Sequence, residues 1–387
     1  MLAAPAILIF ASIGCFKSEP TVIVIDSPEP TANQRAADKA IAFLLAHQQD
    51  DGAWRSDVYG HFRAGDALTP LALNSLLYAS TDPNVLAAVE KGLVFMDRFV
   101  TAEGVIDPTA LLNYPVYTAS LMVKILADSR CRSRTQAFDA WVGLLLDWQM
   151  TEENGWSLDD WQYGGWGYAT SPPRKPKEKP LPAVLEANLS ATAYAVEALR
   201  IAGFTARIRF ENASVFIDRC QNYATEDPDL DFDDGGFFFT PGDPFRNKAG
   251  QVRIKSAKVR HRSYGSATVD GLRCQIACAV YHLPDAVDRR TAATRWLEKG
   301  LTDFANIEHP GNFAPERELD RKAGYFYYTS HICPLLRNTT MAARADAIRD
   351  QLVRIQNEDG SWKNEHKTLR EDDPIVATAF ALRALKQ

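Results

Sequence analysis

A run of aspartates is the first feature of the sequence that could carry chemistry. Four of them alternate with other residues: Asp227, Asp229, Asp231 and Asp233. Carboxylate oxygens at this spacing could hold a calcium ion. However, Asp234 stands where an EF-hand loop requires glycine, and Asp234-Gly235 is an ordinary turn sequence. The run therefore predicts either a calcium site or a structural turn.

A second group lies along one face of a predicted helix. Its members recur every four residues: Asp270, Cys274, Cys278 and His282. Residues at this spacing share a helix face. Aspartate, cysteine and histidine are metal ligands, but on apolar helices lone Cys and His are usually core residues.

Polar and aromatic side chains also gather where apolar segments begin. From them we predict a ligand cavity lined by Tyr117, Tyr264, Asp270, Tyr327, Tyr328 and His331. Helix starts carry partial positive charge and tyrosine rings attract cations, so an anionic or π-stabilised ligand would fit. The alternative is that Ser and Thr cap these helices while Tyr fills the core.

The segments that position these groups are helical. Six of them are apolar nearly all round, as buried helices are: 66–79, 115–127, 188–202, 266–282, 327–336 and 374–385. Their partners, such as 36–47 and 345–355, carry Lys, Arg and Asp on one face. We therefore predict an all-α fold, an (α/α)6 toroid of six helical hairpins in two concentric rings. An open solenoid is the alternative.

A repeated motif at the helix ends favours ring closure. The first copy contains Lys39-Ala40, Phe43-Leu44, Gln48, Gly52 and Trp54, and the last contains Leu352, Gln356, Gly360 and Trp362 at the same spacing. A second copy, with Lys91-Gly92, Gly104 and Ile106, also keeps this spacing, and weaker copies end at Gly155-Trp156, Gly235 to Phe237 and Gly311 to Phe313. Glycine can end each helix with positive φ, and the following aromatic side chain folds back.

This pattern resembles the QW motif of squalene-hopene cyclases and related terpene cyclases, whose toroid the protein prenyltransferase β subunits share. The resemblance covers roughly residues 33–387. It implies a toroid with a central cavity for an apolar or isoprenoid-like ligand. Because QW motifs stabilise the fold, the resemblance says less about activity.

The resemblance also implies roles for individual carboxylates. Asp231-Phe232-Asp233-Asp234 matches the DxDD motif of class II terpene cyclases, in which the central aspartate, here Asp233, would protonate an alkene or epoxide. Such an acid must be kept protonated by burial and by neighbouring carboxylates. Asp373 opens the last buried helix and is a second acid candidate, with helix capping as its alternative.

The prenyltransferases further suggest a metal. They bind zinc through an Asp, a Cys and a later His, and Asp270, Cys274 and His331 are similar, although three residues rather than one separate the Asp and the Cys. The sequence requires no cofactor. Zinc at these three residues and calcium at the aspartate run both remain possible interpretations.

Charge narrows the range of partners. The chain of 387 residues has a net charge of −6, which argues against a nucleic-acid partner. The segment 244–269 is nevertheless basic and holds no acid; its cations are Arg246, Lys248, Arg253, Lys255, Lys258, Arg260 and Arg262. It is either a solvated loop or a surface for phosphate groups.

The amino-terminal residues suggest export. Residues 2–13 are apolar, and Ser12-Ile13-Gly14-Cys15 resembles a bacterial lipobox. We therefore predict an export signal over 1–15 with lipidation of Cys15, a flexible tether over 16–33, and one toroid domain over 34–387 with long loops at 164–182 and 240–263. The lipid would anchor a cell-envelope lipoprotein to the membrane on the periplasmic side. A secreted protein is the alternative.

Three functions remain open. The first is an exported toroid that binds an apolar or isoprenoid-like ligand, with catalysis undecided. The second is a non-catalytic envelope scaffold, whose protein partner the sequence does not indicate. The third is a carbohydrate-active toroid, which would need paired carboxylates in an open groove.

Overall fold

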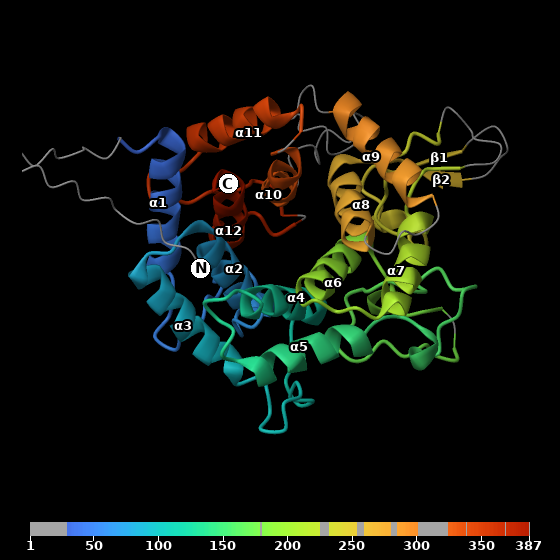
Figure 1. Cartoon of the computed structure of the whole chain (residues 1–387), viewed down its shortest axis with the longest axis horizontal. Helices are drawn as coiled ribbons and strands as arrows, with labels where there is room; N and C mark the ends of the chain where they lie inside the picture. The colour runs from blue at the N-terminus through green and yellow to red at the C-terminus, as the bar shows by residue number, and fades with distance from the viewer. Residues whose placement is uncertain are drawn as a thin grey trace, which may run out of the picture.

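Helices in two concentric rings make up the fold (Figure 1). The computed structural model describes residues 29–178, 180–224, 232–253, 259–279, 285–300, 324–337, 339–367 and 369–386. The inner helices are α2 (Leu68–Ala79), α4 (Pro115–Leu126), α6 (Leu189–Ile201), α8 (Gly265–Cys278), α10 (Tyr325–Leu336) and α12 (Pro374–Leu385). The outer helices are α1 (Ala32–Ala46), α3 (Pro83–Asp97), α5 (Thr135–Asp147), α7 (Arg207–Arg219), α9 (Ala286–Gly300) and α11 (Ala342–Arg354). The all-α toroid of six hairpins is confirmed.

Short elements occupy the loops between these helices. The 3-10 turns are η1 (Gly60–Phe62), η2 (Glu152–Asn154), η3 (Ala183–Leu185) and η4 (Pro244–Arg246). Strands β1 (Gln251–Arg253) and β2 (Val259–His261) form an antiparallel pair in which Val252 lies opposite Arg260. None of the described helices combines the length and the hydrophobicity that crossing a membrane requires.

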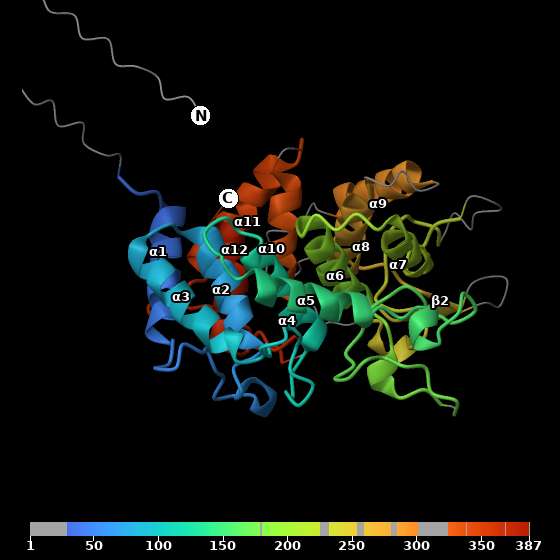
Figure 2. The same cartoon turned by 60° about the horizontal axis from the view of Figure 1, so that its bottom comes forward.

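The ring closes on itself. Each inner helix packs against the next in chain order, and α12 packs against α2 (Figures 1 and 2). The outer helix α1 contacts both the outer helix α11 and the inner helix α12. The first and last hairpins are therefore neighbours, and the open solenoid does not apply.

Burial follows the two helix types that the sequence predicts. In α6 almost every residue up to Leu199 is buried, with small Ala side chains on several faces. In α7 only Phe210, Ala213, Phe216 and Ile217 are buried, which is the three-to-four spacing of a single apolar stripe. Inner helices thus form the core on all sides, and outer helices cover it with one face.

The repeated motif acts as a set of hydrogen-bonded staples. In the first copy the indole nitrogen Nε1 of Trp54 donates to the backbone oxygen of Leu44 at 2.7 Å, and Trp362 does the same to Leu352 at 2.8 Å. The amide Nε2 of Gln48 donates to the backbone oxygens of Gly52 and Ala88, both at 2.9 Å. Because Ala88 belongs to α3, each such glutamine also joins one outer helix to the next.

The third copy of the motif differs from its prediction. Gly155-Trp156 is not the staple; Gln149 donates instead to the backbone oxygen of Gly164 at 3.0 Å, and the indole of Trp166 donates to Leu145 at 2.7 Å. Gly164 has φ +87°, and a Cβ there would meet the backbone oxygen of Asn212 at 1.8 Å. Only glycine fits this approach, whereas Gly155 faces open space apart from one lysine side chain. The predicted copy at 311–313 lies outside the described residues.

Candidate functional site

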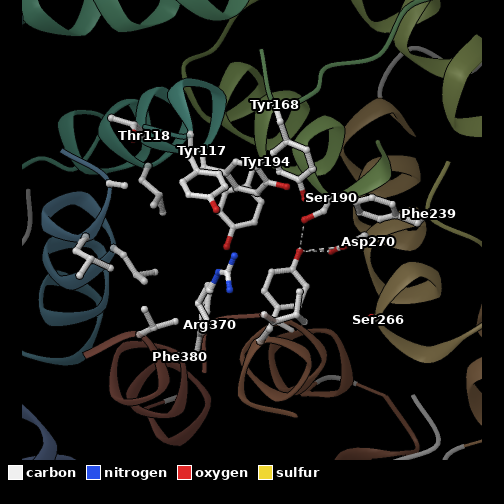
Figure 3. Close-up of a pocket in the computed structure, with 18 of the residues that line it drawn as sticks. Tyr117, Thr118, Tyr168, Ser190, Tyr194, Phe239, Ser266, Asp270, Arg370 and Phe380 are labelled. Atoms are coloured by element: carbon white, nitrogen blue, oxygen red, sulfur yellow. Dashed lines mark hydrogen bonds between the residues drawn. The ribbon is translucent and has the colours of Figure 1, made fainter. Parts of the chain in front are cut away.

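A cavity of about 430 Å³ lies inside the ring, at the amino-terminal ends of the inner helices (Figure 3). All the inner-helix residues that line it come from the first two turns of their helices. Aromatic rings dominate the lining: Phe62, Tyr114, Tyr117, Tyr168, Tyr194, Phe239, Tyr264, Tyr327 and Phe380. Its size is that of a small-molecule site, for which volumes of about 300–1,000 Å³ are usual.

The carboxyl group of Asp270 faces this cavity from α8. Among the described lining residues it is the one carboxylic acid. The hydroxyl of Tyr327 donates to both of its oxygens, at 3.0 Å to Oδ1 and 2.9 Å to Oδ2, and Nη1 of Arg273 donates to Oδ1 at 2.6 Å. The hydroxyl of Ser190 lies 2.7 Å from that of Tyr327 and extends the chain of hydrogen bonds into α6.

Burial controls the protonation of Asp270. Desolvation raises the pKa of this carboxyl to about 6, although the charge of Arg273 and the hydrogen bonds from Tyr327 and Arg273 act in the opposite direction. The group is therefore an acid that still holds its proton in part near neutral pH. Tyr327 and Arg273 are placed to stabilise the carboxylate that remains once the proton has left.

A charged layer lies one helical turn beneath the floor of the cavity. Its members are Lys124, Glu197 and Arg273, each three residues after a lining residue, namely Leu121, Tyr194 and Asp270. Lys124 and Arg273 both contact Glu197 at 2.6 Å, and both lie over the ring of Tyr194, at 5.0 and 5.2 Å from its centroid. Although burial opposes it, these two cations hold the pKa of Glu197 well below its usual range.

The predicted cavity residues divide into two sets. Tyr117, Tyr264, Asp270 and Tyr327 line the cavity. Tyr328 and His331 are buried and lie outside the set of lining residues. Nδ1 of His331 lies 2.7 Å from the backbone oxygen of Tyr327, and burial lowers the pKa of this imidazole well below its usual value. His331 is thus a neutral packing residue behind Tyr327.

Two acids of the DxDD match, Asp233 and Asp234, lie in the segment between α7 and β1. Asp231 is outside the described residues. Asp233 is buried and pairs with Arg260, and Asp234 accepts hydrogen bonds from Ser263 at 2.7 Å and from the indole of Trp296 at 2.9 Å. Neither belongs to the cavity lining. Both are held by partners of the kind that fix a turn.

Asp373 caps a helix. Its Oδ1 accepts hydrogen bonds from the backbone nitrogens of Ile375 at 2.9 Å and Val376 at 3.3 Å, at the start of α12, and its Oδ2 accepts one from the hydroxyl of Ser56. This arrangement satisfies free N–H groups of the first turn. Asp373 also lies outside the cavity lining.

The predicted metal ligands do not come together. Among the described residues no group of three His, Cys, Asp or Glu side chains could hold a metal ion, and this covers Asp270, Cys274 and His331. Asp270 is occupied by Tyr327 and Arg273, and burial raises the pKa of the Cys274 thiol well above its usual value. Of the aspartate run only Asp233 is described, and it pairs with Arg260.

Several lining residues were not predicted as site residues. Tyr168 and Arg370 come from loops, and Tyr194 and Phe380 from the second turns of α6 and α12. Tyr168 stacks on Tyr117 with ring centroids 5.9 Å apart. The inner-helix members could have been found by following each helix one turn further, but the loop members carry no local sequence signal.

Comparisons with known proteins identify the fold. No protein-family model matches the chain, and no curated protein matches it either. A variant of the type II terpene cyclase MstE from Scytonema, solved with geranylgeranyl dihydroxybenzoate, is similar with a TM-score of 0.55 and 14% identity, over 92% of this chain and 96% of that one. A protein from Actinoplanes gives 0.57 and 14%, over 91% and 98%.

A glycosidase is similar to the same degree. The GH76 α-mannanase from Bacteroides thetaiotaomicron gives a TM-score of 0.55 and 9% identity, over 92% of this chain and 95% of that one. This chain has the fold that a terpene cyclase and an α-mannanase share. At these identities the likeness concerns the fold alone, so the activity has to be argued from the cavity.

Proposed function

We propose that the cavity binds an apolar, isoprenoid-like ligand and that Asp270 is a general acid toward one of its double bonds. The observation that carries this proposal is one buried carboxyl group in a chamber lined mainly by aromatic and aliphatic side chains. Aromatic rings favour an apolar chain and also stabilise positive charge that develops on it.

The proposed reaction is a cyclisation started by a proton. The O–H bond of Asp270 breaks, a C–H bond forms at one end of a double bond, and the other carbon becomes a cation. The electrons of a second double bond then form a ring and move the charge along the chain. Loss of a proton, or capture of water, ends the sequence. Tyr327 and Arg273 would stabilise the aspartate carboxylate throughout.

The cavity lining supports this assignment over glycan cleavage, whereas the fold does not separate the two, because a terpene cyclase and a glycosidase are equally similar to this chain. The MstE structure holds a geranylgeranyl compound described as its substrate, and its fold is shared. Glycosidases generally need two carboxyl groups about 5–10 Å apart across the substrate. The described residues that line this cavity supply only Asp270. A scaffold protein would have no need of an internal chamber of about 430 Å³.

The test uses a neutral isoprenoid. Purified protein is incubated with geranylgeraniol, and products are analysed by gas chromatography and mass spectrometry. We expect cyclised products of unchanged mass, or of mass increased by one water. Asp270→Asn should abolish them while leaving geranylgeraniol binding intact, and Asp233→Asn should leave turnover unchanged. Turnover that survives in Asp270→Asn but is lost in Asp233→Asn would transfer the acid role to the DxDD match.

We also propose that the protein is an exported cell-envelope lipoprotein attached through Cys15, a residue outside the described range. The support is the lipobox-like sequence alone. Metabolic labelling with palmitate should mark the wild type and not Cys15→Ser. An unlabelled wild-type protein in the culture medium would favour secretion instead.

A further inference from the structure

Exposed apolar side chains gather at the end of the ring opposite the cavity. Tyr78, Ile201 and Ile276 lie in the last turns of the inner helices α2, α6 and α8, and they are 44%, 53% and 46% exposed. Tyr78 comes two helical turns after Leu71, and Ile201 comes two turns after Tyr194, both of which line the cavity. The three exposed residues form what we call the far-face patch.

One cation beside this patch has no acidic partner. Arg383 lies in the last turn of α12, with its guanidinium carbon 5.5 Å from the centroid of the Tyr78 ring. No carboxylate among the described residues forms an ion pair with Arg383, and its buried Nε makes no hydrogen bond. Buried donors without a partner are uncommon. A positive charge at the edge of an apolar surface suits a segment that is apolar and carries one carboxylate.

The predicted tether 16–33 contains such a segment, which precedes the described range. Residues 21–26 read Thr-Val-Ile-Val-Ile-Asp, so four β-branched apolar residues are followed by one carboxylate. Runs of this kind have high β-propensity and associate with other chains when they are left uncovered. A solvated tether gains nothing from them, whereas a segment that packs on the protein removes them from water.

The course of the chain brings this segment to the far-face patch. Outer helices begin where inner helices end, because residues 80–82 alone join α2 to α3. As the first outer helix, α1 packs on α12 and starts on the side of the ring where α12 ends (Figure 2). The chain from Asp26 to Ala32 can extend over up to about 20 Å, or two interhelical distances of roughly 10 Å. Asp26 can therefore reach Arg383, and residues 22–25 can reach the patch.

We propose that residues 21–26 dock on the far-face patch, where the carboxylate of Asp26 pairs with Arg383 and the apolar side chains cover the exposed ring of Tyr78 and its neighbours. The ion pair fixes the position of the segment, since a guanidinium and a carboxylate match geometrically. Burial of the β-branched side chains supplies the larger part of the attraction. This inference is independent of the proposed function, because none of these residues lines the cavity.

Cysteine cross-linking in the full chain tests the contact. Val24→Cys is combined with Tyr78→Cys in a Cys15→Ser background, and mass spectrometry follows disulfide formation. The five described native cysteines are buried and do not compete. In the control pair Leu111→Cys replaces Tyr78→Cys, because Leu111 is 91% exposed in the loop before α4, at the cavity end of the ring. Docking raises the local concentration of the first two thiols, so we expect them to link roughly tenfold faster than the control pair.

An exchange of charges tests the ion pair. Asp26→Arg and Arg383→Asp should each slow the cross-linking toward the rate of the control pair, and the two substitutions together should restore it. Glu29→Arg is the matched control, since Glu29 is an exposed acid just after the docking segment and should leave the rate unchanged. Circular dichroism checks that the variants fold.

Three results would overturn the proposal. The first is an equal rate of cross-linking for the Tyr78→Cys and Leu111→Cys pairs. The second is a fast rate that neither charge substitution changes, because Asp26 would then not be held by Arg383. The third is a disulfide that joins two molecules, seen as a dimer on a non-reducing gel, which would assign the far-face patch to a second copy of the chain.

Discussion

The side-chain nitrogen of Gln356 donates a hydrogen bond of 2.8 Å to the backbone oxygen of Ala36, a residue 320 positions earlier in the chain. The same nitrogen donates to Gly360 at 2.9 Å within its own staple. Gln48, Gln149 and Gln221 make the equivalent pair of bonds further round the ring. Gln356 thus joins the last outer helix, α11, to the first, α1. The other glutamines use the same hydrogen bond to join outer helices that follow one another in the chain.

Replacing this glutamine should weaken the closed ring. Gln356→Leu removes both hydrogen bonds from this side chain, to the backbone oxygens of Ala36 and Gly360, which costs about 1–3 kcal/mol of unfolding free energy. Urea denaturation measures the loss. Gln351→Leu, at a partly exposed position of α11, is the control and should change stability by at most about 0.5 kcal/mol. Equal effects of the two variants would mean that the staple does not hold the ends together.

Two glycines should respond to alanine in opposite ways. Gly164→Ala places a Cβ 1.8 Å from the backbone oxygen of Asn212 at φ +87°, so we expect a loss of more than about 2 kcal/mol. Gly143 lies within α5 with open space around it, and Gly143→Ala should stabilise the protein by about 0.5–1 kcal/mol. Thermal unfolding separates the two. A stable Gly164→Ala would contradict the assignment of the third staple.

Tyr327→Phe should change the acidity of Asp270. Its hydroxyl donates to both carboxylate oxygens and so favours the charged form. Without it the pKa of Asp270 rises above about 6. If Asp270 is the acid proposed above, turnover of geranylgeraniol requires its protonated form, so turnover by the wild type should fall as the pH increases through about 6, and in the variant this fall should move to higher pH.

A carbon-13 NMR titration of labelled aspartate gives the same shift without relying on activity. Tyr328→Phe is the control, because Tyr328 is buried behind the cavity and is not a lining residue. An unchanged titration of Asp270 in Tyr327→Phe would show that this hydroxyl does not set its protonation.

Glu371 should make stability depend on pH. Burial raises the pKa of this carboxyl to about 7, above its ordinary value of 4.5, so the folded protein holds the proton more tightly than the unfolded chain. Its contribution to stability is complete below pH 4.5 and is lost as the pH rises through 7, a change of up to roughly 3 kcal/mol. Glu371→Gln should remove this part of the pH dependence.

Urea denaturation at pH 5 and pH 8 gives the change in unfolding free energy between these two pH values. This change is then compared between the wild type and Glu371→Gln. Glu365→Gln is a suitable control because Glu365 is exposed in the same segment. If the two variants show the same dependence on pH, Glu371 does not hold a proton in the folded state at pH 5.

The sequence predicts those features that repeat. Gln48 with Trp54 and Gln356 with Trp362 reveal the staples, and the polar starts of the apolar helices reveal four cavity residues, because a ring brings those starts together. The third staple was misplaced because Gly155-Trp156 and Gly164 to Trp166 are similar as sequences. Their difference is the close approach of Gly164 to Asn212, a contact between distant segments.

The remainder of the site depends on loop paths. Arg370 and Tyr168 reach the cavity from irregular segments whose course is set by tertiary contacts, so no periodicity marks them. Asp270 was predicted as a cavity residue and a metal ligand, but its acidity follows from its burial beside Tyr327 and Arg273, which spacing along the chain does not show.

The layer formed by Lys124, Glu197 and Arg273 has a consequence for which molecules fit. Hydrocarbon that extended past Tyr194 would have to separate these paired charges from their partners. The free energy lost in that separation exceeds the free energy gained by burying the alkyl chain. The chamber therefore has a fixed depth, and chains longer than this depth must leave their excess outside. Selection among homologous polyenes by length would then depend on the identity of the residue at position 197 and not on the aromatic walls.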